Sequence, residues 1–250
     1  MKPGAAGPLL YGHRGASALA LENTLGAFAR ARADGADGIE LDVRLTADGE
    51  LAVFHDEDLV RIAGRPGRVA DLSWRELAAV PLPGGERIPR LDQVLAETAP
   101  LLVNVEIKQP GWRRMREVVV AVAACVERAG ARDRVIVSSF DPAAVGLACA
   151  TTPLRCGLLF HARQRRPLRR AWLAPLIRPH ALHPDRVLVD AAAVARWRSH
   201  GYEINVWTVD DPAELRRLAA LRVDGIITND PAAARAALSA PAAGPAQYES

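Results

Sequence analysis

The stretch that decides the fold is GIELDVRLTADGELAVF, residues 38–54. Its first part, Gly38–Val43, alternates charged and apolar residues, which is typical of a β-strand with two different faces. Asp48-Gly49 is then a signal for a tight hairpin turn, so Leu51–Phe54 is predicted as the returning strand. The stretch therefore predicts a strand followed by a hairpin partner that lies outside any regular βα repeat.

Outward from this stretch, short apolar runs alternate with amphipathic segments. Further strands are predicted at Leu9–Tyr11, Leu101–Ile107, Arg134–Ser138, Arg155–Phe160, Ala181–His183, Ile204–Val209 and Gly225–Thr228. The clearest helices are predicted at Thr24–Arg32, Arg113–Arg128, Pro212–Ala220 and Pro231–Leu238. With the hairpin strand set aside, about eight βα units remain, which fits a (β/α)8 barrel better than a doubly wound sheet. No Gly-x-Gly-x-x-Gly opens the first unit, which weakens a dinucleotide-binding alternative.

The chain is predicted to form a single α/β domain, a TIM barrel over residues 1–238. A Gly- and Pro-rich insertion is expected at about residues 57–90, after the second barrel strand, and an Ala/Pro/Gly-rich disordered tail at 239–250. Half of the 250 residues are apolar, which excludes general disorder. The formal net charge is only +3, which argues against a nucleic-acid partner.

The remaining bulk features point to a soluble protein of the cytoplasm. Cys125, Cys149 and Cys156 are an odd number without a C-x-x-C pair, so they are expected to be small buried hydrophobes. Met1–Pro8 lacks the apolar core of a signal peptide. No apolar run reaches the ~18 residues that a membrane span needs. The oligomeric state is left open.

Polar residues gather where the first predicted strands end, and barrel enzymes carry their chemistry there. Because side chains alternate along a strand, Glu40 and Asp42 share one face, and Glu106 and Lys108 share another. Three carboxylates at one site repel each other unless a cation lies among them. Mg2+ and Ca2+ prefer oxygen ligands, so the sequence predicts one divalent metal ion at Glu40, Asp42 and Glu106.

The hairpin leads to a second expectation about this site. If Asp48-Gly49 forms a two-residue turn, Asp42 lies directly opposite His55, and both point to the same face. A three-residue loop shifts the pairing by one residue. His13 follows the first strand, so His13 and His55 are predicted as a general acid and base, because imidazole titrates near neutral pH.

Basic residues complete the candidate site. Of the 32 basic residues, only Lys2 and Lys108 are lysines, so Lys108 suggests a place for a compact ammonium that a guanidinium fork does not fit. Arg14 and Lys108 beside a metal and two histidines suit an anionic phosphate ester. A lone histidine or a Glu-x-Asp pair is often merely structural, and only their joint occurrence at successive strand ends favours a site. His183 is a further candidate for the mouth.

Taken in order, these residues resemble the glycerophosphodiester phosphodiesterase family, within the phosphatidylinositol-phospholipase-C-like barrels. The matching segments run over about residues 9–238: Gly12–Gly15, Glu22–Thr24, Gly38–Val43, Phe54–Asp56, Val105–Lys108, Ser138–Phe140, Leu182–Pro184, Val206–Val209 and Asp224–Pro231. Two departures are Leu21, where the family usually has proline, and Ile62-Ala63, where a threonine usually follows the opening arginine of the insertion.

The resemblance implies hydrolysis of glycerophosphodiesters to glycerol 3-phosphate and an alcohol, with His13 and His55 as the catalytic pair. It implies that the metal is held by Glu40, Asp42 and Glu106. Substrate binding is assigned to Arg14, Lys108, His183 and Trp207. Two alternatives stay open: a lysophospholipase D-type activity on lysophospholipids, and a non-catalytic barrel that binds a phosphate ligand.

One basic segment fits none of these motifs. Between Arg163 and Arg178, six arginines interleave with Trp172, Leu173, Leu176 and Ile177. The segment is expected to be either a solvated helix with a core face or a lid that contacts a membrane surface.

Overall fold

The computed structural model describes residues 7–108 and 111–240. Within these residues, eight parallel strands close into a barrel, because β1 pairs with both β2 and β9. The barrel strands are β1 Leu9–His13, β2 Gly38–Leu45, β4 Leu102–Ile107, β5 Val135–Ser139, β6 Arg155–Phe160, β7 Ala181–Pro184, β8 Glu203–Val206 and β9 Gly225–Thr228. The short strand β3, Leu51–Val53, pairs antiparallel with β2. The predicted (β/α)8 barrel, with this hairpin strand as the surplus run, is confirmed.

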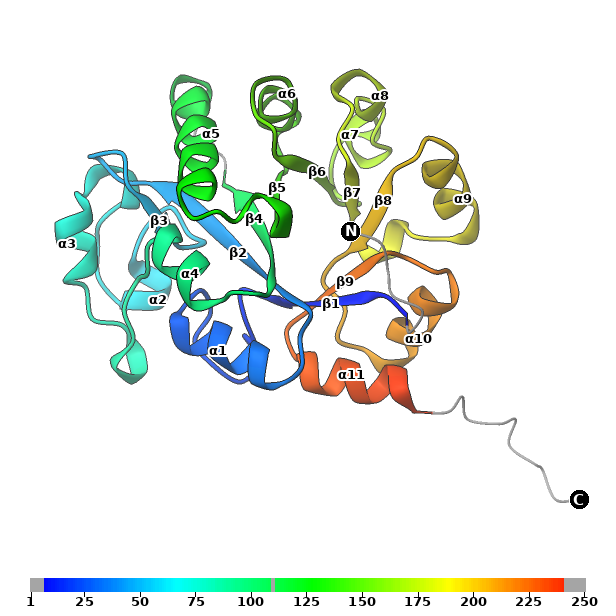
Figure 1. Cartoon of the computed structure of the whole chain (residues 1–250), viewed down its shortest axis with the longest axis horizontal. Coiled ribbons are helices and arrows are strands. Elements are labelled where there is room, and N and C mark those ends of the chain that lie inside the picture. Colours follow the sequence, from blue (N-terminus) through cyan, green and yellow to red (C-terminus); the bar gives the residue numbers. More distant parts are fainter. Residues whose placement is uncertain (1–6, 109–110, 241–250) are drawn as a thin grey trace, which may run out of the picture.

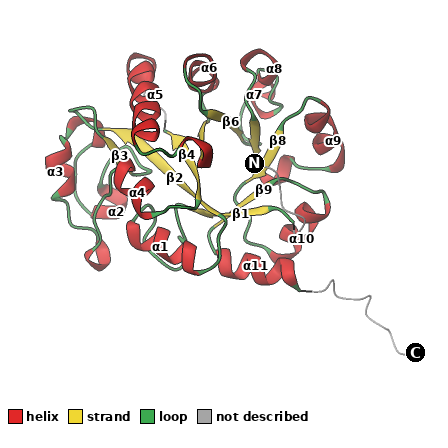
Figure 2. Ribbon diagram, in the orientation of Figure 1, coloured by secondary structure: helices red, strands yellow, loops and turns green. Residues whose placement is uncertain are grey.

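Helices form a ring outside the strands (Figures 1 and 2). They are α1 Leu25–Ala33, α4 Leu91–Glu97, α5 Gly111–Arg128, α6 Pro142–Thr151, α7 Arg166–Arg169, α8 Ala174–Ile177, α9 Ala191–Ser199, α10 Pro212–Ala220 and α11 Pro231–Ser239. The outward strand residues Ile39, Leu41 and Val43 are fully buried against this ring. Asp211, Asp230 and Thr24 cap α10, α11 and α1, and each side chain accepts a backbone N–H of the first helical turn.

The hairpin register differs from the predicted one. Val43 pairs with Val53 and Leu45 with Leu51, and Thr46 N donates to Glu50 O, so three residues form the loop. Gly49 at the end of this loop has a φ of +84°, which a side chain would disfavour. Phe54 therefore lies opposite Asp42, and its N–H donates to the Asp42 carbonyl, so the expected Asp42–His55 pairing is wrong.

The predicted insertion follows this hairpin and has a small apolar core of its own. It carries α2 Val60–Ala63 and α3 Trp74–Ala78 and lies beside β3 in Figure 1. Leu59, Val69, Leu77 and Val80 pack against Phe54 at the end of the hairpin. The insertion is thereby attached directly to the strand that leads to His55.

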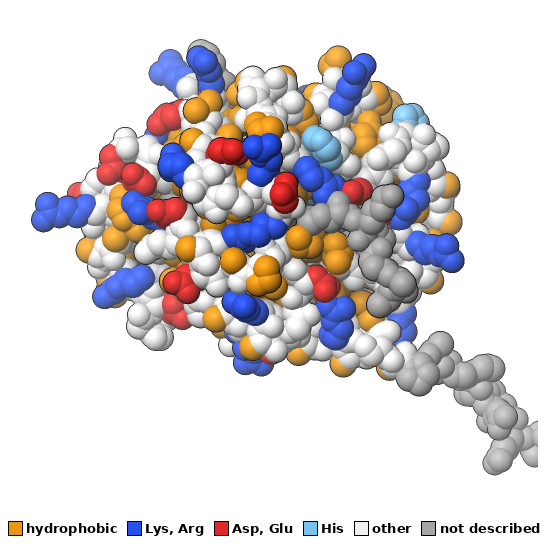
Figure 3. Space-filling model, viewed as in Figure 1, with side chains coloured by type: hydrophobic (Ala, Val, Ile, Leu, Met, Phe, Trp, Pro, Cys, Tyr) orange, Lys and Arg blue, Asp and Glu red, His pale blue; other side chains and the backbone are white. Residues whose placement is uncertain are grey.

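The segment from Arg163 to Arg178 forms two short helices, α7 and α8, and not the single solvated helix that was one of the two expectations. Trp172 is 58% exposed and Leu176 is 80% exposed. No helix among the described residues is long and apolar enough to cross a membrane. On the face shown in Figure 3, basic and acidic side chains are interspersed. Of the predicted tail, residues 241–250 lie outside the described part of the chain.

Candidate active site

A tight turn after β1 carries the first two candidate residues to the rim of the barrel. Gly15 has a φ of +86°, and a Cβ there would lie 2.6 Å from the backbone of Ala27 in α1. Only glycine fits this turn, which holds His13 at the end of β1 and Arg14 just beyond it. The Arg14 N–H donates to Glu40 Oε2 at 2.9 Å, so the turn is also fastened to β2.

The three predicted metal ligands lie together inside the barrel. Asp42 pairs directly with Glu106 across the β2–β4 ladder, and Glu40 pairs with Asn104. One carboxylate oxygen from each of Glu40, Asp42 and Glu106 lies within 4.8 Å of the other two, and all three side chains are buried. The alternation of side chains along the strands, which predicted this cluster, is confirmed.

Two cations lie against these carboxylates. Lys108 Nζ is 2.7 Å from Glu106 Oε1 and 3.1 Å from Asp42 Oδ1, and Arg14 Nε is 3.3 Å from Asp42 Oδ2. Burial opposes the charge of Asp42, yet Lys108 and Arg14 hold its pKa below the ordinary range. Burial, followed by repulsion from Asp42, raises the pKa of both Glu40 and Glu106. With all three carboxylates ionised, the cluster would carry more negative charge than its two cations neutralise.

This charge imbalance fits a divalent cation. Asp42 Oδ1 is buried and accepts no hydrogen bond, although Lys108 lies near it. Buried carboxylate oxygens without a donor are costly, and metal coordination is one of the few ways to satisfy them. An all-oxygen donor set of this kind suits a hard ion such as Mg2+ or Ca2+.

We expect the stability of the metal-free protein to report this imbalance. The pKa of Glu106 is raised from 4.5 to about 8, so its stabilising contribution is complete below pH 4.5 and lost as pH rises through about 8. A Glu106→Gln variant lacks this titration. Its free energy of unfolding in EDTA, minus that of the unaltered protein, should therefore increase from pH 5 to pH 8. Denaturant unfolding at several pH values measures this difference, and a difference independent of pH would contradict the assignment.

The two histidines are each oriented through Nδ1. His13 Nδ1 lies 2.7 Å from Asn229 Oδ1, and His55 Nδ1 lies 2.6 Å from Asp56 Oδ1. These oxygens accept a hydrogen bond from Nδ1–H, which leaves the Nε2 atom of each neutral ring as the base. Burial lowers the pKa of both imidazoles, which favours their neutral form. His13 Nε2 lies 4.0 Å from Glu40 Oε2, beside the acid cluster.

Further side chains that orient these residues received no role in the sequence analysis. Asn23 Nδ2 donates to Asp42 Oδ2 at 2.8 Å, and Asn23 itself has a φ of +57° in the turn before α1. Asn229 Nδ2 donates to Asp210 Oδ2 at 2.6 Å, which fixes the partner of His13. Asp210 follows β8, just as the other polar site residues follow their strands. This position after a strand is the sequence feature from which its role could have been predicted.

The insertion also contributes to the site. Arg61 on α2 donates from Nε to Asp56 Oδ2 at 2.6 Å and from Nη2 to Glu22 Oε1 at 2.7 Å. Glu22 in turn accepts from Arg14 Nη1 at 2.9 Å. Arg61 thereby links the partner of His55 to Arg14, across the rim of the barrel.

The two remaining candidates differ in their placement. His183 is 1% exposed in the barrel interior, where its Nε2 lies 3.1 Å from Asn205 Nδ2, so it does not line the mouth as expected. Residue 183 faces inward on β7, and its imidazole packs over Gly157 of β6, which offers no Cβ. Trp207 is half-buried, packs edge-on against Phe140 at 5.2 Å, and donates from Nε1 to the His183 carbonyl.

Two cavities bear on where a ligand fits. One of about 540 Å3 is bordered by His13, Arg14, Ser17, Asp210 and Asn229, next to the acid cluster. A larger one of about 690 Å3 lies between α8 and α9, outside the barrel and lined by none of the candidate site residues. The chemistry of the lining residues, and not the volume, identifies the first as the candidate substrate cavity.

A closed (β/α)8 barrel with buried carboxylates, two oriented histidines and two cations at its carboxyl rim belongs to the class of barrel hydrolases that act on phosphate esters. Within this class, the model of the glycerophosphoryl diester phosphodiesterase family matches residues 13–233. The chain belongs to this family and is an enzyme of the phosphoric diester hydrolase class.

Individual relatives agree with this assignment. A glycerophosphodiester phosphodiesterase of Caldanaerobacter subterraneus subsp. tengcongensis is 35% identical over 234 residues, which cover 89% of this chain and 94% of that protein. The crystal structure of glycerophosphodiester phosphodiesterase from Thermotoga maritima has a TM-score of 0.74 at 32% identity, covering 90% and 96% of the two chains. An Oleispira antarctica phosphodiesterase, in complex with the product sn-glycerol-3-phosphate, has a TM-score of 0.84 at 24% identity and covers 94% and 98%. This last similarity shows the shared fold.

Proposed function

We propose that the protein hydrolyses glycerophosphodiesters to glycerol 3-phosphate and an alcohol, with one divalent metal ion and a pair of histidines. The observation that carries the proposal is the buried cluster of Glu40, Asp42 and Glu106 with His13 beside it. The product bound by the Oleispira antarctica relative, sn-glycerol-3-phosphate, is consistent with the same reaction here.

In this proposal the carboxylates hold the metal, which when bound neutralises phosphate charge and polarises the reacting phosphorus centre. Arg14 and Lys108 hold phosphate oxygens beside it. Both cations already lie at the edge of the acid cluster, within 3.3 Å of Asp42. Fixed positive charge at the site of developing negative charge lowers the barrier, because it needs no reorganisation during the reaction.

His13 and His55 move the protons. One Nε2 atom accepts the proton of the attacking hydroxyl as the new phosphorus–oxygen bond forms. The other histidine, protonated, donates to the oxygen of the leaving alcohol as its bond to phosphorus breaks. If the attacking hydroxyl belongs to the glycerol, a cyclic phosphate results, and water opens it in a second step in which the two histidines exchange roles.

Offering a panel of substrates tests the proposed reaction. Glycerophosphocholine, glycerophosphoethanolamine and a lysophospholipid are incubated with the protein and Mg2+ or Ca2+, and the products are separated. We expect glycerol 3-phosphate from the first two. Absence of turnover for every substrate with either metal would overturn the proposal.

A conservative change at the single lysine of the site tests the role of a compact charge. Lys108 Nζ lies between Glu106 and Asp42, and the side chain is only 12% exposed. A guanidinium there is wider and directs its donors in a fixed plane, so Lys108→Arg should displace the carboxylates. We expect turnover to fall by about 10–100-fold, as for changes to groups that orient metal ligands. Arg116→Lys on α5 serves as the matched control, and equal rates in both variants would contradict this role.

A lysophospholipase D-type activity is the second candidate, and exposed apolar side chains favour it. Trp172 and Leu176 lie in the arginine-rich segment that follows β6, and both are largely exposed. Aromatic and aliphatic side chains among arginines suit the surface of an anionic membrane. Under this hypothesis the protein sediments with anionic vesicles at low salt, Trp172→Ala reduces sedimentation, and lysophospholipid turnover yields the acylated glycerol phosphate. Failure to sediment would remove the membrane contact.

A further inference from the structure

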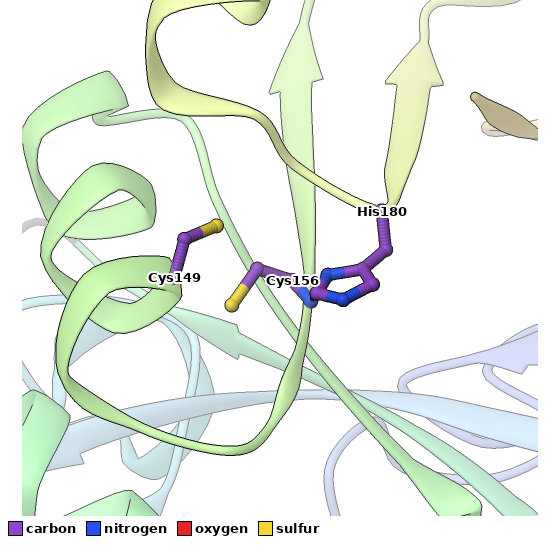
Figure 4. Close-up of side chains that lie close together, drawn as sticks. All are labelled: Cys149, Cys156 and His180. Atoms are coloured by element: carbon purple, nitrogen blue, oxygen red, sulfur yellow. Dashed lines mark hydrogen bonds between the residues drawn. The ribbon is translucent and has the colours of Figure 1, made fainter. Parts of the chain in front are cut away.

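A second group of metal-ligating side chains lies away from the acid cluster. Cys149 on α6, Cys156 in β6 and His180 just before β7 converge from three elements (Figure 4). One ligand atom from each residue lies within 4.8 Å of the other two. Cys156 is the second residue of β6, so the group sits at the amino ends of the strands. Catalytic groups of such barrels lie at the carboxyl ends, whereas residues at the amino ends serve stability.

The backbone holds this group together without any ligand. A short connection after α6 returns the chain into β6, which brings Cys149 and Cys156 near each other. His180 N donates to Cys156 O at 2.8 Å, and Cys156 N donates to His180 Nδ1 at 3.1 Å. The Cys156 thiol also lies within hydrogen-bonding reach of the Cys149 sulfur. Cys149 is half-exposed and His180 exposed, so an ion can enter from solvent.

The donor set selects the kind of ion. Two sulfurs and one imidazole suit Zn2+, which binds cysteine and histidine tetrahedrally, and do not suit the hard ions that fit the acid cluster. Two thiolates balance the charge of one Zn2+, so little net charge is placed at a partly buried position. A disulfide between the cysteines would use both sulfurs and give His180 no part as a ligand.

We propose that Cys149, Cys156 and His180 bind one zinc ion, with water as the fourth ligand, and that this ion fastens α6 and β6 to the start of β7. A neutral imidazole has one nitrogen with a free lone pair. Zinc binding therefore replaces the hydrogen bond from Cys156 N–H to His180 Nδ1. The site is structural, and turnover at the other end of the barrel does not depend on it.

Cobalt substitution tests the proposal directly, because Co2+ bound by thiolates gives a charge-transfer absorption that carboxylate ligands do not give. The whole protein is kept reduced with a phosphine and titrated with Co2+ and then Zn2+. We expect one equivalent of Co2+ to produce the thiolate band and Zn2+ to remove it. We expect Zn2+ also to raise the thermal unfolding midpoint.

Substitutions test whether the thiolate absorption band arises from the proposed ligands. Cys149→Ser and His180→Gln change exposed or half-exposed side chains, so both variants should fold. Mutation of residues that only hydrogen-bond to metal ligands lowers metal affinity by ~10–100-fold, so we expect loss of a ligand to lower Co2+ affinity by more than this. We also expect that Zn2+ no longer raises the thermal unfolding midpoint of these two variants. The control is Cys125→Ser, because Cys125 lies on α5 and is not a proposed ligand; this variant should bind Co2+ and Zn2+ as the unaltered protein does. All three variants should retain turnover. Absence of the thiolate band in the unaltered protein, or its persistence in Cys149→Ser, would overturn the proposal.

Discussion

Replacing Asp42 by asparagine is expected to lower glycerophosphodiester turnover by about 10^3-fold or more while the protein remains folded. Asp42 lies at the centre of the site: Lys108, Arg14 and Asn23 all contact its carboxylate. The amide keeps the size of the side chain, but it replaces one acceptor oxygen by an NH2 donor and removes the charge that a metal requires. The loss should therefore appear in kcat together with a weaker dependence on added metal.

A matched substitution outside the site separates the loss of the metal ligand from a general effect of replacing a carboxylate by an amide. Asp34 ends α1 and pairs with Arg30 on the outside of the barrel, so Asp34→Asn changes the same functional group away from the site. We expect Asp34→Asn to keep full turnover. Thermal unfolding of both variants verifies folding, and a folded Asp42→Asn variant with more than about a tenth of normal turnover would contradict the metal-ligand role.

Removing either histidine is expected to cost about 10^2–10^4-fold in kcat, the range typical of positioned acids and bases. The His13→Ala and His55→Ala variants each lose one of the two proton-transfer groups, so the bell-shaped pH profile of kcat should lose one limb. The control is His200→Ala, since His200 is exposed at the end of α9 and contacts no candidate site residue. Turnover within a fewfold of normal in either catalytic variant would refute its assignment.

Asp56 provides a graded version of the same test. Its carboxylate accepts from His55 Nδ1 and from Arg61, so it positions the ring and touches no reacting atom. Asp56→Asn should lower kcat less than His55→Ala does. Because it removes a negative charge next to the imidazole, it should also shift the His55 limb of the pH profile to lower pH. A fall in kcat without any shift would indicate a merely structural role for Asp56.

The acid cluster could be predicted from sequence because strand periodicity is a local property. Glu40 and Asp42 lie two residues apart in one strand, so they share a face of it in any fold that keeps the strand. The same holds for Glu106 and Lys108 in their own segment. The position of His55 could not be derived in this way, because it depends on the length of the hairpin loop. The loop has three residues and not two, so Phe54, and not His55, lies opposite Asp42. His55 nevertheless influences Asp42 electrostatically, because it follows the end of the hairpin strand.

Contacts between distant segments account for what sequence reasoning missed. The pairing of His13 with Asn229 joins the ends of the first and last barrel strands, and it depends on β1 closing the barrel against β9. His183 was expected at the mouth because it ends a strand run, but its position on β7 turns the ring into the interior. Whether a strand-end residue faces inward or lies above the rim depends on the stagger of neighbouring strands, which no local pattern specifies.

In the proposed reaction, a divalent metal held by Glu40, Asp42 and Glu106 is required for hydrolysis. The most direct measurement is release of glycerol 3-phosphate from glycerophosphocholine by protein that has been stripped with EDTA and then supplied with Mg2+ or Ca2+. We predict no release after stripping, recovery when one of these ions is returned, and no recovery in Asp42→Asn. Undiminished release by the stripped protein would contradict the claim.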